Sequence, residues 1–385
     1  MFKAIFICIP LVVFVLVMLG FVFPTCRALQ LRSRTTALWS AVILLACLKF
    51  LFFRILGGDE FNPDLPLAVI WVWNWMYSGA MILVLLSVPL SLVSLKARVP
   101  AWVRVALVPA LAWGLAARGI WNGVRIPDVR EIEVDCPGLP ASLDGYRILQ
   151  LADIHVSASA PRWRTEAIVA KANAAGAGLI VCTGDIVDGE PALRRADVEP
   201  LKDLKARDGV WFCTGNHEFY NDWGEWLALY NEWGIRFLRN ECVFPHEDLA
   251  LGGVDDDAVT WHWDMKSEIP DVEAAFEAAT NGEFRVLLQH CPRRVRENVF
   301  RGVRLQLSGH THGGIMPGLN LLVAWHNDGF VRGIYRISDD GAASGQAGRL
   351  YVSPGCGQWS GFPIRFFDDS EISVITLRQG KGPAR

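Results

Sequence analysis

Four long apolar stretches dominate the first third of the chain. Residues 4–23 contain no charged side chain, 35–53 carry only Lys49, and 65–95 are again uncharged. A fourth stretch, 99–117, is weaker because Arg104 lies near its start. About 20 apolar residues are enough for a helix to cross the hydrocarbon core of a bilayer. The pattern therefore predicts an all-α transmembrane region over residues 1–120 with four helices, in which Lys49 lies near a helix end and can snorkel to the interface.

Two other interpretations of this region stay open. Three spans would result if one of the weaker stretches does not cross. A cleaved signal peptide followed by fewer spans is the other possibility. Against it, the first apolar run is longer than a usual signal sequence, and the residues that follow, PTCRALQ, contain no small-x-small cleavage site.

Beyond residue 120 the pattern changes to short apolar runs alternating with helical spacing. Residues 162–176 have a helical period, with Ile168, Val169 and Ala172 on one side. The short runs, which we interpret as buried strands, are 146–152, 179–183, 210–214, 286–289, 303–308, 349–353 and 371–377. Alternating strands and helices predict an α/β domain over residues 121–385, with sheets covered by helices.

Composition and charge agree with this division into two regions. The chain is 52% hydrophobic, yet only three of its 40 acidic residues, Asp59, Glu60 and Asp64, lie in residues 1–120. The formal net charge is −3, so we expect no nucleic-acid binding. Four of the nine cysteines, Cys136, Cys242, Cys291 and Cys356, could form disulfides if the second region lies outside the cytoplasm, but their pairing cannot be read from the sequence.

The distribution of Lys and Arg predicts the orientation in the membrane. Arg27, Arg32 and Arg34 lie between the first and second spans, and Lys96 and Arg98 lie between the third and fourth. Basic loops tend to stay in the cytoplasm. With four spans, we therefore expect a multi-pass protein of the cell membrane with the α/β domain on the extracytoplasmic side.

Polar side chains follow five of the predicted strands directly. They are Asp153 and His155, Asp185 and Asp188, Asn216 and His217, His290, and His310 and His312. In α/β sheets, ligands bind at the carboxyl ends of the strands. Five separate stretches of the chain can therefore bring these groups to one edge. Asp188 could instead cap the helix that follows it.

The donor types indicate metal ions. Seven oxygen or nitrogen donors are available: Asp153, His155, Asp185, Asn216, His290, His310 and His312. That is too many for one tetrahedral zinc ion, which takes about four, but it suits two divalent ions bridged by a carboxylate. The set contains no thiolate, so Mn, Fe, Zn or Co are plausible occupants. Paired ions recur in enzymes that cleave phosphate esters, where they orient the phosphoryl oxygens and activate a bridging water.

The ordered motifs DIH, GDIVD, GNHE, a lone His and GHTH closely resemble those of the calcineurin-like metallophosphoesterases. The closing segment, YVSPGCGQWSGFPIRFFDDSEISVITL, resembles that of the bacterial membrane-associated branch. The resemblance implies two packed β-sheets flanked by helices, and a dinuclear hydrolase of phosphodiesters or phosphomonoesters with a metal-bridged hydroxide as nucleophile.

The resemblance also implies a role for each site residue. One metal ion would be bound by Asp153, His155, Asp185 and His312, and the other by Asp185, Asn216, His290 and His310, with Asp185 as the bridge. His217 would be catalytic, protonating the leaving oxygen, and Asp188 would hold the other nitrogen of its ring. Glu218 is interpreted as structural. For Arg365 a contact with substrate phosphate, and for the aromatic stretch 260–265 a place in the substrate cleft, are possibilities left open.

Other functions remain as alternatives. The chain could be a non-catalytic, membrane-tethered scaffold or sensor that uses the same fold, although such proteins usually lose metal ligands. A transporter is disfavoured because no predicted span carries paired charges. Membrane anchoring favours a lipid-linked or envelope-derived phosphoester as substrate.

Overall fold

The computed structural model describes residues 2–261, 269–280, 282–338, 347–367 and 369–380. The chain divides into two compact units. The helical unit comprises Met1–Gly123 together with the short segment Ser360–Ile364, and the α/β unit comprises Val124–Trp359 and Arg365–Arg385. The polypeptide therefore leaves the α/β unit after Trp359 and returns to it at Arg365.

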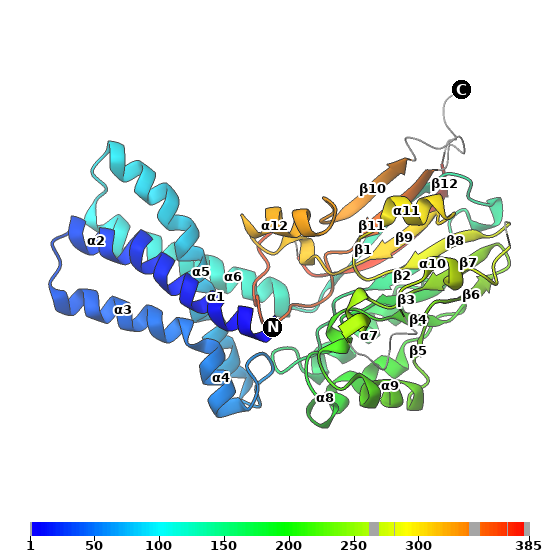
Figure 1. Cartoon of the computed structure of the whole chain (residues 1–385), viewed down its shortest axis with the longest axis horizontal. Helices are drawn as coiled ribbons and strands as arrows, with labels where there is room; N and C mark the ends of the chain where they lie inside the picture. Colours follow the sequence, from blue (N-terminus) through cyan, green and yellow to red (C-terminus); the bar gives the residue numbers. More distant parts are fainter. Residues whose placement is uncertain (1, 262–268, 281, 339–346, 368, 381–385) are drawn as a thin grey trace. The chain divides into compact units, whose positions relative to one another are not determined.

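The helical unit is built from the predicted apolar stretches (Figure 1). Its helices are α1 (Phe2–Val17), the π-helical turn Met18–Val22, α2 (Phe23–Ala28), α3 (Ser33–Cys47), α4 (Lys49–Gly57), α5 (Leu67–Lys96), a second π-helical turn (Val103–Leu107) and α6 (Val108–Val124). Among the described residues, three continuous helical segments are long and apolar enough to cross a membrane: Cys8–Ala28, Leu67–Lys96 and Val103–Val124.

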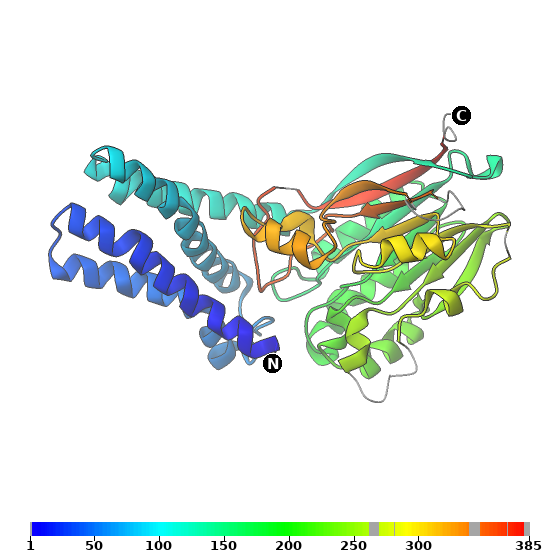
Figure 2. The ribbon, with the colours of Figure 1, turned by 45° about the horizontal axis from the view of Figure 1, so that its top comes forward.

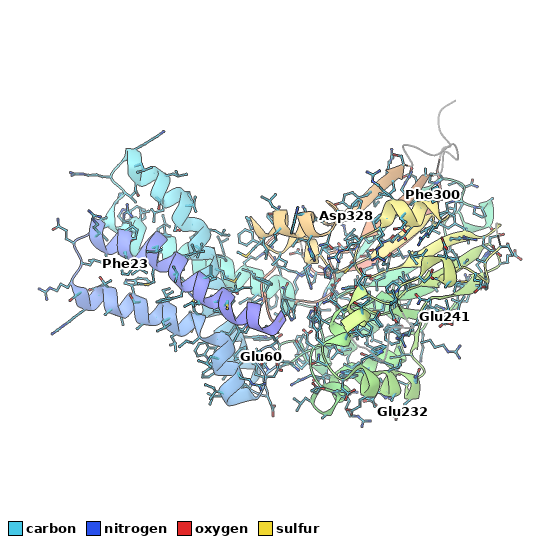
Figure 3. All side chains as sticks on the ribbon, in the orientation of Figure 1. Phe23, Glu60, Glu232, Glu241, Phe300 and Asp328 are labelled. Carbon is cyan, nitrogen blue, oxygen red and sulfur yellow. The ribbon has the colours of Figure 1, made fainter. Side chains whose placement is uncertain are left out.

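The second predicted span is bent. Helices α3 and α4 meet at an angle of 55°, so together they form either one broken span or a re-entrant loop. The helical unit thus offers three spans, or four if the bent pair crosses. Large apolar side chains also cover the outside of these helices, as Phe23 illustrates (Figure 3), and Leu95 is likewise exposed. An apolar outer surface is what a helix bundle needs in a lipid solvent.

Lys49 does not snorkel as expected. It begins α4, directly after the bend, and its side chain is fully buried. Its ammonium Nζ donates a hydrogen bond of 2.6 Å to the carbonyl oxygen of Ser360 and lies 4.6 Å from the ring centroid of Phe50. A buried ammonium needs such partners because desolvation is costly. The hydroxyl of Ser360 in turn donates to the carbonyl of Phe61 at 2.5 Å, so two contacts hold this segment.

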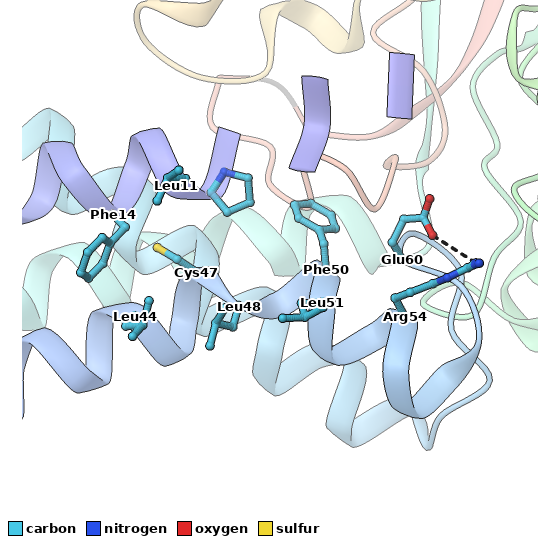
Figure 4. A pocket seen from close by; sticks show the side chains of 10 residues that line it. Leu11, Phe14, Leu44, Cys47, Leu48, Phe50, Leu51, Arg54 and Glu60 are labelled. Atoms are coloured by element: carbon cyan, nitrogen blue, oxygen red, sulfur yellow. Dashed lines mark ion pairs between the residues drawn. The ribbon is translucent and has the colours of Figure 1, made fainter. Parts of the chain in front are cut away.

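A cavity of about 460 Å³ lies within the helical unit. Figure 4 shows its lining, which comprises Pro10, Leu11, Phe14, Leu44, Cys47, Leu48, Phe50, Leu51, Arg54 and Glu60. The carboxylate of Glu60 is 3.5 Å from Nη1 of Arg54, at one end of the cavity. This lining is mainly apolar, and its one carboxylate is already in an ion pair. The cavity is therefore separate from the cluster of metal-binding side chains that the sequence predicts after the strands.

Two packed sheets form the α/β unit. The first has the order β1-β12-β2-β3-β4-β5, and the second β10-β11-β9-β8-β7-β6. The strands are β1 (Asp128–Cys136), β2 (Arg147–Leu151), β3 (Leu179–Thr183), β4 (Val210–Cys213), β5 (Arg236–Phe237), β6 (Glu241–His246), β7 (Leu249–Gly253), β8 (Phe284–Leu288), β9 (Leu305–Ser308), β10 (Gly333–Ser338), β11 (Ala347–Val352) and β12 (Glu371–Gln379). A shared core between the sheets includes Ile148 and Val181 of the first and Val286 and Leu307 of the second.

Helices cover the outer faces of both sheets, as Figures 1 and 2 show. Helices α7 (Arg162–Ala174), α8 (Pro191–Val198) and α9 (Trp223–Glu232) pack on the first sheet. On the second sheet, α10 (Val272–Ala275) packs against β7 and β8, and α11 (Val295–Phe300) against β10 and β11. The last helix is α12 (Leu319–His326). The fold class expected from the resemblance, two packed sheets flanked by helices, is confirmed.

All nine cysteines are free. The disulfides that the sequence left open among Cys136, Cys242, Cys291 and Cys356 are therefore not formed in this structure.

Candidate metal centre

Parallel pairing brings the predicted site residues to one end of the two sheets. Strands β2, β3 and β4 are parallel neighbours in the first sheet, and β8 and β9 are parallel neighbours in the second. The loops after these strands are joined by main-chain hydrogen bonds, such as His155 N to Asp185 O at 3.1 Å. Across the two sheets, the amide of His310 donates to the Asp153 carboxylate at 3.0 Å. The five loops therefore form one connected layer.

The side chains on these loops form three overlapping donor groups. They are Asp153 with His155 and His312, His155 with Asp185 and His217, and Asp185 with His290 and His310. Within each group the donor atoms lie within 4.8 Å of one another. Asn216, the remaining predicted ligand, places its Oδ1 2.9 Å from Nδ1 of His310. All seven predicted ligands thus come together, and Asp185 belongs to two of the groups.

Ring nitrogens of three histidines point into the site. Nδ1 of His290 donates to the carbonyl of Thr183 at 2.6 Å, which leaves its Nε2 directed at a carboxylate oxygen of Asp185, 3.2 Å away. Nε2 of His155 and Nε2 of His312 lie 3.2 Å apart. Imidazole nitrogens and carboxylate oxygens that converge in this way are usual ligands of divalent metal ions, so the donor set fits bound metals.

Backbone strain is concentrated at the same residues. Asp153, His155, Asp185, His310 and His312 all have positive φ, between 46° and 71°. This region is sparsely populated by residues with a Cβ, and each such residue costs on the order of 1–3 kcal/mol. The fold therefore holds five ligand residues in backbone conformations that lower the stability of the protein but place the ligand side chains in the site.

Two glycines of the motifs are required by close packing against carboxylates. A Cβ on Gly215 would collide with the carboxylate of Asp185, and a Cβ on Gly309 would collide with that of Asp153. The glycines of GNHE and GHTH thus allow the main chain to approach the two acidic ligands from either sheet.

Electrostatics keep some of these donors in the forms that bind metals. Burial raises the pKa of Asp185, but the surrounding histidines, His290 first, outweigh it and hold this pKa well below its usual range. Burial and the neighbouring His290 lower the pKa of His310 to about 3, so its imidazole stays neutral. Two ligands differ: burial raises the pKa of Asp153, and at His290 burial is outweighed by the charge of Asp185, which raises the pKa of this histidine well above the usual range. A bound cation would oppose both rises.

His217 lies at the edge of the donor groups. Its Nδ1 donates to Oδ1 of Asp188 at 2.5 Å, and its Nε2 lies 3.9 Å from Oδ2 of Asp185. Burial lowers the pKa of His217, but Asp185 and Asp188 raise it more strongly, to about 9. The rings of Tyr220 and Trp359 flank the imidazole, with centroids 4.7 Å and 5.4 Å away. An oriented imidazolium with one nitrogen directed into the site is suited to proton transfer.

Asp188 has a second partner that the sequence did not predict. Its Oδ2 lies 3.1 Å from Nδ1 of His155, so one carboxylate holds both His155 and His217. Burial raises the pKa of Asp188, and the two histidines lower it by more, to about 2. The alternative role as a helix cap does not apply, because Glu190 occupies the N-cap position of α8.

The carboxylate of Glu218 binds main-chain amides of the loops that carry the ligands. It accepts hydrogen bonds from the amides of Asp185 at 2.9 Å, Ile186 at 2.7 Å and Gly215 at 2.6 Å. It thereby joins the loops after β3 and β4, which carry Asp185 and Asn216. The structural interpretation of Glu218 agrees with these contacts.

Other residues of the site were missed or left open. Asp256 is buried and lies just after β7, a strand that the sequence did not predict. Burial raises the pKa of Asp256, and the neighbouring His290 partly offsets that rise. The signal was the run GGVDDD after an apolar stretch. Arg365 is buried, donates to the carbonyl of Gly357 and lies 3.3 Å from Nδ1 of His312. Most of the aromatic stretch 260–265 lies outside the described residues.

The comparison with known families rests on the same segment of the chain. Residues 146–314, which contain all five motifs, match the family model "Calcineurin-like phosphoesterase". Residues 146–314 form a domain of the calcineurin-like phosphoesterase superfamily. The resemblance inferred from the motifs is thereby confirmed.

Relatives of this superfamily member come from animals and bacteria. The chain is 34% identical over 275 residues to "Transmembrane protein with metallophosphoesterase domain" of Danio rerio, covering 69% of this chain and 60% of the relative. Its counterpart in Bos taurus is 32% identical over 292 residues, covering 71% and 63%. An "Uncharacterized metallophosphoesterase" of Helicobacter pylori is 29% identical over 263 residues, covering 68% and 66%. The matches span less than two thirds of the two vertebrate proteins, and the likeness is not confined to bacteria.

Proposed function

We propose that this protein is a membrane-anchored hydrolase of phosphate esters that depends on two divalent metal ions. The observation that carries the proposal is the position of Asp185. Its Oδ2 lies 3.2 Å from Nε2 of His290 and 3.7 Å from Nε2 of His155, one ligand of each proposed site, so this carboxylate can bridge two ions. The apolar helices of the N-terminal unit and the vertebrate relatives, which are described as transmembrane proteins, support the membrane anchor.

The proposed metal ligands divide into two sites that share Asp185. Asp153, His155 and His312 would complete one site, and Asn216, His290 and His310 the other. Two divalent ions at these positions, whether Mn, Fe, Zn or Co, would supply Lewis acidity to a phosphoryl group and to the attacking water. The strained backbone and the buried surroundings keep the ligands in place before substrate arrives.

His217 supplies the proton that the leaving group needs. Hydrolysis forms a bond from phosphorus to the oxygen of water and breaks the bond to the alcohol oxygen, which leaves with a negative charge. The Nε2 proton of the His217 imidazolium can neutralise that charge. Asp188 accepts the hydrogen bond from Nδ1 and so keeps Nε2 directed into the site. Tyr220 and Trp359 limit the movement of the ring.

The test uses the purified full chain reconstituted with each candidate metal. We expect about two ions per chain and turnover of bis-p-nitrophenyl phosphate or p-nitrophenyl phosphate that a chelator abolishes and added metal restores. The ratio of the two rates shows whether a diester or a monoester is preferred. Two bound ions without turnover of either compound would instead support the alternative, a membrane-tethered scaffold or sensor. Fewer than two ions would contradict the dinuclear centre.

A further inference from the structure

Helix α12 exposes a cluster of large apolar side chains on the α/β unit, which is the catalytic unit of the proposed function. Leu321 is 71% exposed, Leu322 56% and Trp325 78%. Positions 321, 322 and 325 lie on one face of the helix. None of the eight residues of α12, all of them described, is buried. A contiguous exposed group of this kind marks an interaction surface rather than a core element.

Two hydrogen bonds join the segment around α12 to the metal-ligand loops. The hydroxyl of Thr311, between His310 and His312, donates to the carbonyl of Val331 at 2.6 Å. The side chain of Arg293, three residues after His290, donates from Nε to the carbonyl of His326 at 3.2 Å. Both contacts lie at or just beyond the C-terminal end of α12 and join it to loops that carry predicted ligands, so whatever binds α12 is held beside the metal centre.

We propose that α12 inserts into the interfacial layer of a lipid bilayer, and that the substrate is a phosphate ester with an apolar tail. This proposal rests on the proposed phosphoesterase function. The same chain carries helices apolar enough to cross a membrane, so a bilayer is the apolar phase that the catalytic unit meets. Exposed leucines with a tryptophan, and a cation beside the helix end, form the usual chemistry of an interfacial helix.

The arrangement explains how an amphipathic substrate reaches a buried centre. An apolar tail can stay among the lipid chains around Leu321 and Trp325 while the phosphate enters the site. Arg293 donates to the carbonyl of His326 and so places a positive charge where α12 meets the loop that carries His290. The tail then adds binding energy that a water-soluble ester lacks.

Two esters that differ only in their tails test the inference on the full chain in lipid nanodiscs. Methyl p-nitrophenyl phosphate and dodecyl p-nitrophenyl phosphate have the same leaving group. We expect kcat/KM for the dodecyl ester to exceed that for the methyl ester by at least about tenfold, the effect of burying a few methylenes. The double variant Leu321→Gln/Trp325→Gln should lose this advantage and keep the methyl-ester rate. Phe300→Gln, which alters an exposed aromatic residue at the end of α11, is the matched control and should keep both rates.

A measurement without turnover tests the lipid contact independently. In nanodiscs with brominated acyl chains, the fluorescence contributed by Trp325, taken as the difference between wild type and Trp325→Phe, should be quenched. The contribution of Trp163, an exposed residue of α7, should not be. Equal quenching of the two, or an unchanged tail advantage in the double variant, would overturn the proposal. Quenching of Trp325 in a protein that hydrolyses no ester would retain the lipid-binding helix and reject the proposed function.

Discussion

Oδ2 of Asp188 lies 3.1 Å from Nδ1 of His155, while Oδ1 of the same carboxylate accepts a hydrogen bond from Nδ1 of His217. A predicted metal ligand and the predicted proton donor are therefore oriented by one side chain. A carboxylate that holds a ligating histidine fixes its tautomer and raises its basicity. Asp188 thus acts on the metal centre and on proton transfer together.

Asp188→Asn should consequently cost metal affinity as well as rate. Loss of a partner of a ligating histidine typically costs about 10–100-fold in metal affinity or activity. We expect a loss in this range in the affinity of the site that contains His155, measured by chelator competition, together with a lower kcat at saturating metal. Unchanged affinity would mean that Asp188 serves His217 alone, which is the role expected from the sequence.

Glu218→Gln should destabilise the protein and weaken metal binding. The carboxylate accepts three main-chain hydrogen bonds, and an amide can present only one acceptor oxygen while its NH₂ group opposes the remaining donors. Each buried amide left without an acceptor costs about 1–3 kcal/mol. The melting temperature and the metal content should both fall. Glu225→Gln, an exposed residue of α9, is the control and should change neither. An unaltered melting temperature would show that the three contacts contribute little.

Asp185→Asn tests the bridge. The substitution removes one negative charge from both proposed sites at once, so we expect fewer than two ions per chain and no measurable turnover. His246→Ala is the control, because His246 lies on β6 and belongs to none of the donor groups. Full metal occupancy together with normal turnover in Asp185→Asn would rule out the two-metal arrangement.

His217→Ala should lower the rate without emptying the metal sites. General acid catalysis is worth about 10²–10⁴-fold, and we expect a loss in that range for an alkyl leaving group and a smaller one for p-nitrophenolate. Since His217 also lies within one donor group, metal analysis decides its role. A variant that no longer binds metal would place His217 among the ligands.

The pH profile provides a second measure of His217. Its pKa is raised to about 9 despite burial, because Asp185 and Asp188 favour the imidazolium. Activity that needs the protonated ring should decrease as the pH rises through this pKa. Removing the charge of Asp188 removes one cause of the rise, so Asp188→Asn should move the basic limb of kcat to lower pH. A limb at the same pH in both proteins would show that another group controls it.

The strands that carry the site could be predicted because each is a short apolar run followed at once by polar residues, as in LIVCT before Asp185. Strands β6 and β10 could not, because both are largely solvent-accessible and have no continuous apolar run. Strand β7 was missed although it is buried, since its sequence, LALGG, is short and ends in two glycines.

Contacts among the side chains were harder to predict than their convergence. The family resemblance implied a contact between Asp188 and His217, but the contact of Asp188 with His155 depends on how two loops from different strands are packed. The exposure of α12 also depends on tertiary packing, because LNLLVAWH has the composition of a core helix. In the same way, an apolar pattern predicted that 35–53 is helical, but it could not predict the bend between α3 and α4.

That bend determines the topology, because it sets the number of crossings. If α3 and α4 cross together as one span, residues 58–66 and the catalytic unit lie on the same side of the membrane, opposite the basic loops around Arg32 and Arg98. If the pair is re-entrant, residues 58–66 lie on the same side of the membrane as the loop around Arg32. The loop with Lys96 and Arg98 then lies on the opposite side, and the catalytic unit lies on the same side as residues 58–66 and Arg32.

Reporter fusions after Pro63 and Pro127, compared with one after Leu31, therefore resolve the arrangement. The Lys and Arg distribution favours the four-span form with both basic loops in the cytoplasm. We expect alkaline phosphatase to be active and green fluorescent protein to be dark after Pro63 and after Pro127, and the reverse after Leu31. If the reporters at Leu31, Pro63 and Pro127 all indicate the cytoplasm, the bent pair is re-entrant and the catalytic unit is cytoplasmic. That result would overturn the predicted orientation and leave the chemistry of the metal centre unaffected.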